Sequence, residues 1–471
     1  MKFGGSCLKD KNAFEKILNI LNIYKSSKKI LVASAFNGIT DLLLKAAENL
    51  DNSTEVDKNI TIIGQKHTNI MNQIFEQNSQ YYSTSVDWLD ERLSELDDVF
   101  GDIQEFGLEP YYKDYVLSFG ERISTFILNQ YLLSKGLDSE FFQANDIIIT
   151  NDDFNNAYPI YELTKNRVKN RIMPLLENPK TDTILCITGF IARNKIGYIT
   201  TLGRGGSDYT ATILARSIHE VGNEEEVKVI LWKDVDGLLA INPKYIPNAA
   251  LIKHLDYDEA KEIANFGAKV LHPKCLEAIE RQKIPLEIRN FDKPKEDVNF
   301  TRISPHTDKE QIKGISTIEK ATIITVSSGS LVDVPGVLAE IFKVMGKNNI
   351  SVSLVSQSSS EISTSFVVEK KDSEKAINAL QKEEYFSEFF EFGYEDVAVM
   401  NITGTKILEN KTKAMIFQAL DKKDIHVKAL SQSSEELNLS IVIDPADLFD
   451  AINIIHDDLC EEFNVNICKS D

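Results

Sequence analysis

Over the first 300 residues, short apolar runs rich in β-branched side chains alternate with amphipathic stretches. The runs at 28–36, 181–190 and 227–235 are typical of buried strands, whereas 14–24 and 123–135 have apolar residues at helical spacing. Strands that alternate with helices predict βαβ units and a mainly parallel sheet covered on both faces. Residues 1–300 are therefore expected to form one α/β domain.

Three polar segments each follow a predicted strand, and these are the candidate ligand loops. They are "NGIT" (37–40), "GFIARN" (189–194) and "DVDG" (234–237). Ligands of such sheets bind beyond the carboxyl ends of the strands. We therefore expect a binding site where these segments meet.

After about residue 300 the chain repeats itself. Shifted by 75 positions, "SQSSSEISTSFVV" (356–368) aligns without a gap with "SQSSEELNLSIVI" (431–443), and Ile341 and Ile350 of the preceding segment fall on Ile416 and Ile425. Because the register also holds through a helix, we favour a true repeat over chance similarity of serine-rich strands. The repeat predicts two copies of a small α+β domain, at 315–390 and 391–471, with a strand from about 308–318 as a candidate to complete the second.

Composition narrows the class of protein. A chain of 471 residues is long enough for roughly three domains of about 150 residues. The net charge of −20 argues against a nucleic-acid or anionic-membrane surface, although it permits a small basic pocket. The five cysteines form no Cys-x-x-Cys pair, which favours a reducing compartment. There is no apolar run of membrane-spanning length and no signal-peptide core, so we expect a cytoplasmic protein.

The segment "TTLGRGGSDYTATIL" (200–214) sets Arg204 among three glycines. Glycines let a ligand approach the backbone closely, and the guanidinium fork suits a carboxylate or a phosphate. Ser207 or Asp208 is expected to cap a helix that starts near Tyr209, whose amides would face the ligand. The pattern predicts an anion site; the alternative is a tight turn with a capped helix and a solvated arginine.

Other segments carry weaker signals. Lys2 precedes Gly4-Gly5 in "MKFGGSCLKD", which fits either a phosphate cradle or a structural turn. In "SFGERIS", Glu121 follows a glycine at an expected helix start, where an acidic residue also complements the helix N-terminus. His272 precedes Pro273 in an expected turn, and we assign it no chemistry.

Taken together, these segments resemble the aspartate kinases of the amino-acid-kinase superfamily, in the same order and at similar spacing. The matching pieces are "KFGGSC", "SAFNGIT", "SFGERIS", "GFIARN", "TTLGRGGSDYTA", "WKDVDG", "YDEAKEIANFGAKVLHP" and the paired repeats. The resemblance covers nearly the whole chain, and the repeats resemble the two ACT domains that regulate these enzymes. It implies a three-layer αβα sandwich with a mainly parallel sheet, followed by two α+β ACT domains of ferredoxin-like fold.

The resemblance implies transfer of the γ-phosphoryl group of ATP to the β-carboxylate of L-aspartate, giving 4-phospho-L-aspartate. This is the first step towards lysine, threonine and methionine. A carboxylate with a pKa of about 3.9 is already ionised at neutral pH, so the nucleophile needs no general base. Bringing it to a polyanion instead requires positioning and fixed positive charge.

The resemblance also assigns roles to residues. Lys2 would neutralise the transferring phosphoryl group, and Asp208 would orient the cationic groups. Arg204 would bind the substrate α-carboxylate, and Glu121 its α-ammonium. The hydroxyl donors implied near the reacting groups belong to Ser34, Thr40 and Ser207.

The implied nucleotide site is less regular. Its positions are Gly4, Gly5, Ser6, Lys233, Asp234, Leu239, Lys244, Lys269 and Val270. Leu239 and Lys244 stand where many relatives have tyrosine and arginine, and Cys7 ends a "GGSC" that replaces the usual Gly-Gly-Thr-Ser. Mg²⁺ is expected with ATP, held mainly by phosphate oxygens, with no protein metal site. These departures leave open an impaired, amino-acid-sensing regulatory protein. A kinase for another amino acid such as glutamate is a second alternative, because Arg204 with Glu121 fits any α-amino acid.

The repeats imply regulation and assembly. ACT domains of this kind pair across a dimer, so a homodimer or larger homo-oligomer is expected, with a feedback amino acid bound at the junction. The implied effector positions are Val337, Leu338, Val352, Ser353, Gln357 and Ser358. Because lysine-sensitive relatives commonly have aspartate where Ser353 stands, we expect threonine first and lysine second as the effector, with insensitivity as the third alternative.

Overall fold

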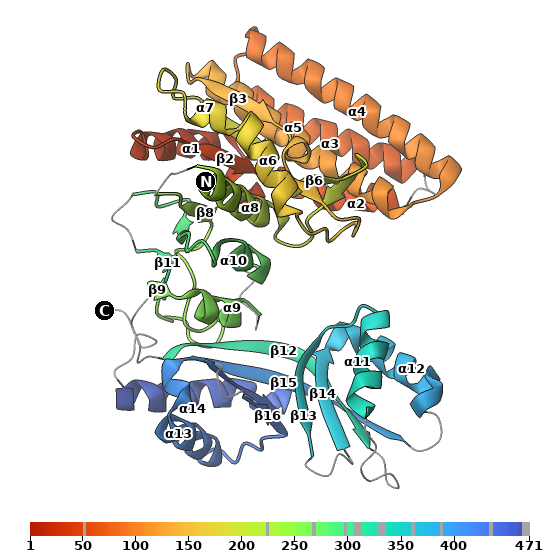
Figure 1. The fold of residues 1–471 in the computed structure, drawn as a ribbon, viewed down its shortest axis with the longest axis vertical. Coiled ribbons are helices and arrows are strands. Elements are labelled where there is room, and N and C mark those ends of the chain that lie inside the picture. The colour runs from red at the N-terminus through yellow and green to blue at the C-terminus, as the bar shows by residue number, and fades with distance from the viewer. Residues whose placement is uncertain are drawn as a thin grey trace. The chain divides into compact units, whose positions relative to one another are not determined.

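The computed structural model describes residues 1–49, 53–222, 226–265, 270–295, 299–305, 312–327, 336–358, 363–386, 390–432 and 437–463. The chain forms two compact units (Figure 1). The first comprises residues 1–238, 253–257 and 270–305, and the second comprises 239–252, 258–269 and 306–471. Each unit is described by itself.

The first unit is built on an eight-stranded sheet of order β3-β5-β2-β1-β8-β10-β11-β9. Its strands are β1 (Lys2–Phe3), β2 (Ile30–Ala33), β3 (Ser139–Phe142), β5 (Ile184–Thr188), β8 (Val229–Lys233), β9 (His254–Leu255), β10 (Leu286–Asn290) and β11 (Thr301–Ile303). Neighbouring strands are parallel except for β10 and β11. The predicted mainly parallel sheet is confirmed.

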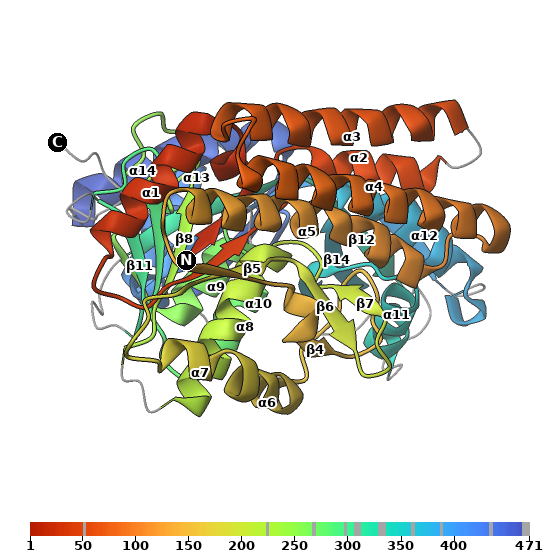
Figure 2. The same ribbon diagram turned by 90° about the horizontal axis from the view of Figure 1, so that it is seen from above.

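Helices cover both faces of this sheet (Figure 2). One face carries α1 (Lys11–Ile23), α2 (Ile39–Glu48), α3 (Ser53–Ile74), α4 (Gln80–Phe106) and α5 (Pro110–Ser134). The other carries α6 (Tyr161–Arg171), α7 (Met173–Leu176), α8 (Gly206–Val221) and α10 (Pro273–Ile279). Every residue of β5 is buried, which explains why its sequence is continuously apolar rather than alternating. A small sheet of β4 (Ile149–Thr150), β6 (Ile191–Asn194) and β7 (Ile199–Thr201) completes the unit.

The structure corrects three local predictions. The helix expected at 123–135 is only the end of α5, which begins at Pro110. In "GFIARN", residues 191–194 form strand β6 rather than a loop. Thr40 of "NGIT" lies in the first turn of α2. The expected strands at 28–36, 181–190 and 227–235 are present as β2, β5 and β8.

The second unit contains a six-stranded sheet of order β13-β14-β12-β15-β17-β16, in which all neighbours are antiparallel. Its strands are β12 (Ile312–Ser327), β13 (Val352–Gln357), β14 (Ser363–Glu369), β15 (Glu391–Gly404), β16 (Ala429–Ser431) and β17 (Asn438–Ile443). Its helices are α11 (Val337–Lys347), α12 (Ser373–Lys382), α13 (Asn410–Asp421) and α14 (Leu448–Phe463), and all of α9 (Tyr257–Asn265) except its first residue also belongs to this unit.

The sequence repeat corresponds to two successive helix-strand-strand-helix segments, α11-β13-β14-α12 and α13-β16-β17-α14. The two long strands β12 and β15 run through both halves of the sheet, with an irregularity in register between Ile318 and Ala321. Before that point, residues 312–318 of β12 pair with 399–404 of β15. The predicted repeat of an α+β segment is therefore present, on one antiparallel sheet.

Two further observations concern composition. Cys7, Cys186 and Cys275 are free and buried. Among the described residues, no helix combines the length and apolar character that a membrane crossing requires.

Candidate phosphoryl-transfer site

Two lysines and one aspartate form the centre of the site. Lys2 in β1 pairs in register with Leu231 of β8, so Lys2 and Lys233, two residues beyond Leu231, project from the same face of the sheet. Helix α8 carries Asp208 in its first turn. The Asp208 carboxylate lies 2.8 Å from the Lys2 Nζ and 2.7 Å from the Lys233 Nζ. We refer to these three side chains as the lysine–aspartate cluster.

Two of the three members of the lysine–aspartate cluster are buried, Lys233 is half-buried, and the cluster carries a net positive charge. Lys2 is only 6% exposed and Asp208 only 4%. Burial by itself would raise the pKa of Asp208, but the two ammonium groups outweigh burial and hold the pKa below its ordinary value. Asp208 therefore stays ionised, fixes both lysines and leaves one positive charge uncompensated.

A glycine-containing loop follows Lys2. A short 3₁₀ helix spans Gly5–Leu8. A Cβ atom at Gly5 would lie 2.8 Å from the Ala35 carbonyl oxygen, and one at Gly4 would lie 3.4 Å from the Lys2 Nζ. Glycine is thus required where the loop packs against the segment after β2, as expected of a backbone cradle for phosphate.

A hollow of about 160 Å³ opens beside this loop. Its lining includes Ser6, Cys7, Lys9 and Asp234. The Cys7 thiol is buried 3.6 Å from the Trp232 carbonyl oxygen, and burial raises its pKa, so it lies there as a neutral thiol. Sequence reasoning missed Lys9, which gave no signal beyond being a charged residue near a glycine pair.

The loop before α8 has the left-handed backbone conformation that its glycines predict. Gly203 and Gly205 have φ angles of 76° and 71°, in the left-handed region that favours glycine. Gly205 is the N-cap residue and no side chain caps the helix, so the expectation that Ser207 or Asp208 caps a helix near Tyr209 is wrong. The helix starts earlier because a left-handed glycine turns the chain without a capping side chain. The Gly206 amide donates to the Gly203 carbonyl oxygen at 3.0 Å, so only the amides that follow it in the first turn remain for a ligand.

Arg204 is exposed, and within the described part of the chain it has no hydrogen-bond or ion-pair partner. It lies close enough to His272 to affect that ring, whose pKa is lowered by burial, by Lys274 and by Arg204. The His272 Nδ1 accepts from the backbone N–H of Lys274, so His272 caps α10. The Arg204 fork is therefore available to an anion.

Glu121 lies in the middle of α5, not at a helix start as expected. The prediction took Gly120 as a sign of a helix start, but this glycine is needed for packing inside the helix. A Cβ atom there would lie 2.7 Å from the Ala35 Cβ. Glu121 is 4% exposed, and burial raises its pKa to about 8 in spite of the Ala35 amide and the nearby Lys2. Its Oε2 atom finds no hydrogen-bond partner among the described residues. A buried acceptor without a partner in the protein is suited to a cationic hydrogen-bond donor from a ligand.

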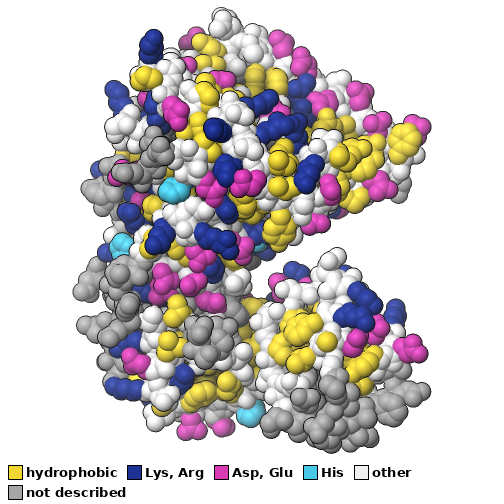
Figure 3. All heavy atoms as spheres, viewed as in Figure 1, with side chains coloured by type: hydrophobic (Ala, Val, Ile, Leu, Met, Phe, Trp, Pro, Cys, Tyr) yellow, Lys and Arg dark blue, Asp and Glu magenta, His cyan; other side chains and the backbone are white. Residues whose placement is uncertain are grey.

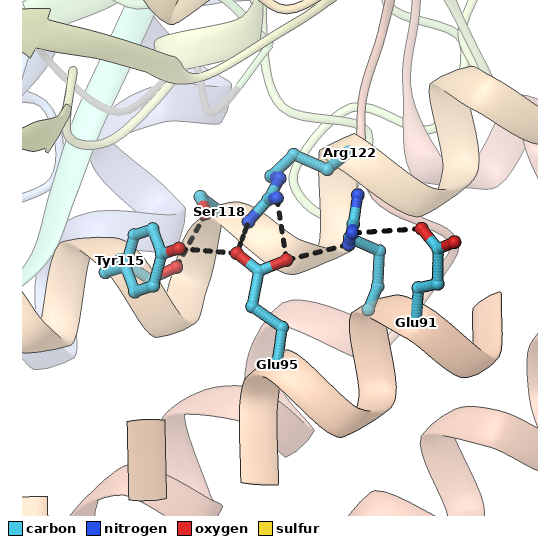
Figure 4. Close-up of polar contacts among 6 residues, drawn as sticks. Glu91, Glu95, Tyr115, Ser118 and Arg122 are labelled. Atoms are coloured by element: carbon cyan, nitrogen blue, oxygen red, sulfur yellow. Dashed lines mark hydrogen bonds and ion pairs between the residues drawn. The ribbon is translucent and has the colours of Figure 1, made fainter. Parts of the chain in front are cut away.

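The next residue, Arg122, anchors α5 on α4 (Figure 4). Its Nη1 and Nη2 each lie 3.0 Å from an oxygen of Glu95, a bidentate pair, and the Glu95 carboxylate also accepts from Tyr115 and from Arg92. Sequence reasoning missed this clamp: Arg122 lies in "SFGERIS", but nothing in the sequence points to Glu95 as its partner. The clamp fixes the rotation of α5 and so the position of Glu121.

The three predicted hydroxyl residues lie on elements around the lysine–aspartate cluster. The Ser34 backbone N–H donates to the Phe3 carbonyl oxygen at 3.1 Å, and Ser207 is buried so close to Gly189 that a Cβ there would lie 2.6 Å from it. Thr40 is half-buried in α2.

Asp114 of α5, which the sequence did not single out, accepts from the Thr201 N–H at 2.7 Å and ties α5 to β7.

The remaining nucleotide positions are not all gathered in the first unit. Lys233 belongs to the lysine–aspartate cluster, and Asp234 is exposed beside Cys7. Val270 is half-buried before α10, and Lys269 lies outside the described residues. Leu239 and Lys244 belong to the second unit, where the Lys244 Nζ is 2.7 Å from Glu319. Among described residues, no three His, Cys, Asp or Glu side chains converge as metal ligands would.

The predicted effector positions occupy one end of the second unit. Val337 and Leu338 begin α11. Val352 and Ser353 lie in β13, at one edge of the sheet, where the register with β14 shifts between Val352 and Leu354. Gln357 ends β13, and Ser358 follows it.

The parallel sheet, the glycine loop and the lysine–aspartate cluster are those of an α/β protein suited to bind a phosphate-bearing ligand, and comparisons with known proteins identify its family. Residues 1–290 match the Amino acid kinase family, and residues 324–383 and 407–459 match an ACT domain. The lysine-sensitive aspartokinase 3 of Escherichia coli is 30% identical over 78% of this chain and 77% of its own length. The chain belongs to the amino acid kinase family and, within it, to the aspartokinases with C-terminal ACT domains.

One further relative is a longer protein than this chain, and two solved structures resemble the chain in fold. The bifunctional aspartokinase/homoserine dehydrogenase of Buchnera aphidicola is 28% identical over 98% of this chain, which spans only 56% of that protein's length. E. coli aspartokinase III in complex with aspartate and ADP has a TM-score of 0.80 at 24% identity, covering 97% of this chain and 98% of its own. The same enzyme in complex with lysine and aspartate has a TM-score of 0.77, with the same identity and coverage. These structures share the fold of this chain.

Proposed function

We propose that the chain transfers the γ-phosphoryl group of ATP to the β-carboxylate of L-aspartate, giving ADP and 4-phospho-L-aspartate. The observation that carries this proposal is the lysine–aspartate cluster, in which Asp208 holds Lys2 and Lys233 on one face of the sheet beside the glycine loop. The bond between the γ-phosphorus and the bridging oxygen breaks as the carboxylate oxygen bonds to phosphorus. No proton is transferred.

The lysines supply the fixed positive charge that this reaction needs. An ionised carboxylate must approach a polyanion, so the barrier lies in charge repulsion and alignment rather than in activating the nucleophile. Lys2 neutralises the transferring group, and Asp208 keeps both ammonium groups in place before the substrates arrive. Preorganised charge of this kind costs no rearrangement during the reaction.

Arg204 and Glu121 give the site its preference for an amino acid. The unpaired Arg204 fork binds the α-carboxylate, and the buried, unpartnered Glu121 oxygen accepts from the α-ammonium. The hydroxyl groups of Ser34, Thr40 and Ser207 lie on the surrounding elements and complete the substrate contacts. E. coli aspartokinase III, which binds aspartate and ADP, supports this choice of substrate.

In this proposal the nucleotide phosphates bind the loop at Gly4, Gly5 and Ser6, where Gly4 lies so near the Lys2 ammonium that a Cβ atom on it would be 3.4 Å from the Nζ. Mg²⁺ bound to the phosphate oxygens neutralises part of their charge. Lys233 and Asp234, at the end of β8, flank the same loop. In this proposal Val270, half-buried before α10 in the first unit, contacts the rest of the nucleotide.

The test is aspartate-dependent ADP release by the full chain, with hydroxylamine present to trap the acyl phosphate. Glutamate is the competing substrate, and Lys11→Ala, on an exposed side chain of α1, is the control for Lys2→Ala. We expect ADP release with aspartate, little with glutamate, and loss only in the Lys2 variant. Absence of release with either amino acid in a folded sample would favour an amino-acid-sensing regulatory protein instead.

We further propose that a feedback amino acid binds at α11 and β13 in a homodimer formed through the ACT domains. Ser353 at the irregular edge strand and Gln357 suit threonine, whereas the lysine-sensitive E. coli relative favours lysine. Titration of each amino acid against the initial rate separates them, with Ser353→Asp as a variant expected to favour lysine. Coupling of about 1–3 kcal/mol would change aspartate affinity by roughly 5- to 150-fold. If neither amino acid binds, the repeats serve assembly alone.

A further inference from the structure

A second basic site lies in the first unit, apart from the lysine–aspartate cluster. A groove of about 760 Å³ runs between α6 and the β6–β7 hairpin. Helix α6 contributes residues three or four apart, which therefore share one face of the helix. The lining comprises Ile149, Leu163, Asn166, Arg167, Asn170, Arg171, Arg193, Asn194, Lys195, Ile196 and Gly197.

The lining carries four cationic side chains and no acidic one, on a chain whose net charge is −20. Two carboxylates lie beside the lining: Asp152 accepts from the Asn194 side-chain amide at 2.8 Å, and Asp146 forms longer ion pairs, 3.6 Å from Arg171 and 3.9 Å from Arg193. Arg167 donates to the Asp146 backbone carbonyl at 3.2 Å. One loosely placed carboxylate thus faces three guanidinium groups and leaves most of their charge uncompensated. In Figure 3, Lys and Arg side chains gather on the surface around α6.

Repulsion among the cationic side chains of the groove affects the pKa of Arg167. Burial lowers its pKa, and Arg193 and Arg171 lower it further, while Asp146 acts in the opposite direction. Converging arginines are costly unless an anion is shared among them. Asn166 and Asn170 are exposed and have no partner among the described side chains, so their amides are available as additional donors.

We propose that this groove binds a small polyanion that carries phosphate groups. Guanidinium forks match the oxygens of phosphate in bidentate pairs, and only an anion with two or more charges balances the groove. The apolar side chains of Leu163 and Ile196 border the cationic floor, so the ligand is a phosphorylated organic molecule or a short polyphosphate.

The test is calorimetric titration of tripolyphosphate into the full chain, with ADP and aspartate at saturation so that the kinase site is filled. Variants Arg171→Ala and Arg193→Ala remove one fork each. Lys169→Ala, an exposed α6 residue outside the lining, is the matched control. Citrate replaces tripolyphosphate in a second arm to separate phosphate from carboxylate chemistry.

We expect one tripolyphosphate per chain, an affinity that falls as salt rises, and a loss of about tenfold or more in each arginine variant but not in the control. Thermal melting checks that all variants are folded. Absence of binding at millimolar tripolyphosphate, or equal binding by the arginine variants and the control, would overturn the site. Citrate binding as tight as that of tripolyphosphate would overturn the assignment to phosphate.

Discussion

Aspartate binding should release a proton from Glu121. In the free protein the pKa of this buried carboxyl is raised to about 8, so at pH 7 only roughly one molecule in ten carries the carboxylate. The substrate α-ammonium pairs well only with the ionised form. Binding therefore includes the cost of deprotonating Glu121 whenever the pH lies below 8.

The size of the effect follows from that pKa. If only the ionised form binds, the dissociation constant for aspartate falls about tenfold per pH unit well below the pKa, and by about 50-fold between pH 6 and pH 8. At pH 7 close to one proton should leave per aspartate bound. Titration calorimetry in two buffers of different ionisation enthalpy measures both quantities.

Glu121→Gln provides the variant, and Glu105→Gln, on the exposed side of α4, provides the control. The amide introduced by the first substitution keeps the shape of the side chain but does not titrate, so affinity should be weaker and nearly independent of pH. The control should retain the full pH dependence. An aspartate dissociation constant that is constant from pH 6 to 8, with no proton release in the unmodified chain, would refute the role of Glu121.

Other predictions concern catalysis, specificity and stability. Lys2→Ala should lower kcat by about 10²–10³-fold with little change in aspartate KM, and unchanged turnover would make Lys2 a turn residue. Arg204→Ala should raise the aspartate KM, with poor rescue by Arg204→Lys; a raised KM for ATP alone would place this loop on the nucleotide side. The folded-state pKa of Glu121 is raised, so the contribution of this residue to stability is full below about pH 4.5 and is lost as the pH rises through 8. Glu121→Gln should therefore be thermally more stable than the unmodified chain at pH 8.5 but not at pH 4. Glu95→Gln should lower the melting temperature and raise the aspartate KM, because it removes the charged partner of the buried Arg122 at a cost of about 3–5 kcal/mol, whereas Glu91→Gln should change neither.

Much of the architecture follows from the sequence alone. The continuous apolar runs of β2, β5 and β8 are explained by a parallel sheet with both faces covered, and the shift of 75 residues corresponds to the two helix-strand-strand-helix segments. The glycines of the loop before α8 are needed for left-handed φ angles. These features depend on local preferences and on periodic burial, which the order of residues encodes directly.

Element boundaries depended on tertiary context. Gly120 suggested a helix start, yet α5 continues through it because the missing side chain lets the helix pack against Ala35. Likewise Ser207 and Asp208 are good capping residues in isolation, but Gly205 caps the helix two or three residues earlier, and Asp208 pairs with the two lysines. In both places a long-range contact outweighed the local preference.

Only the tertiary structure decided the electrostatics. Lys2 and Lys233 are far apart in the chain and meet because β1 and β8 are neighbouring strands. The packing of the elements likewise decides that Arg204 is exposed and that the Glu121 Oε2 atom has no hydrogen-bond partner among the described residues. It also decides that Glu95 pairs with Arg122. The basic groove needs α6 and the β6–β7 hairpin side by side. A pKa or an uncompensated charge depends on burial and on neighbours in space, and the sequence specifies those only through the completed fold.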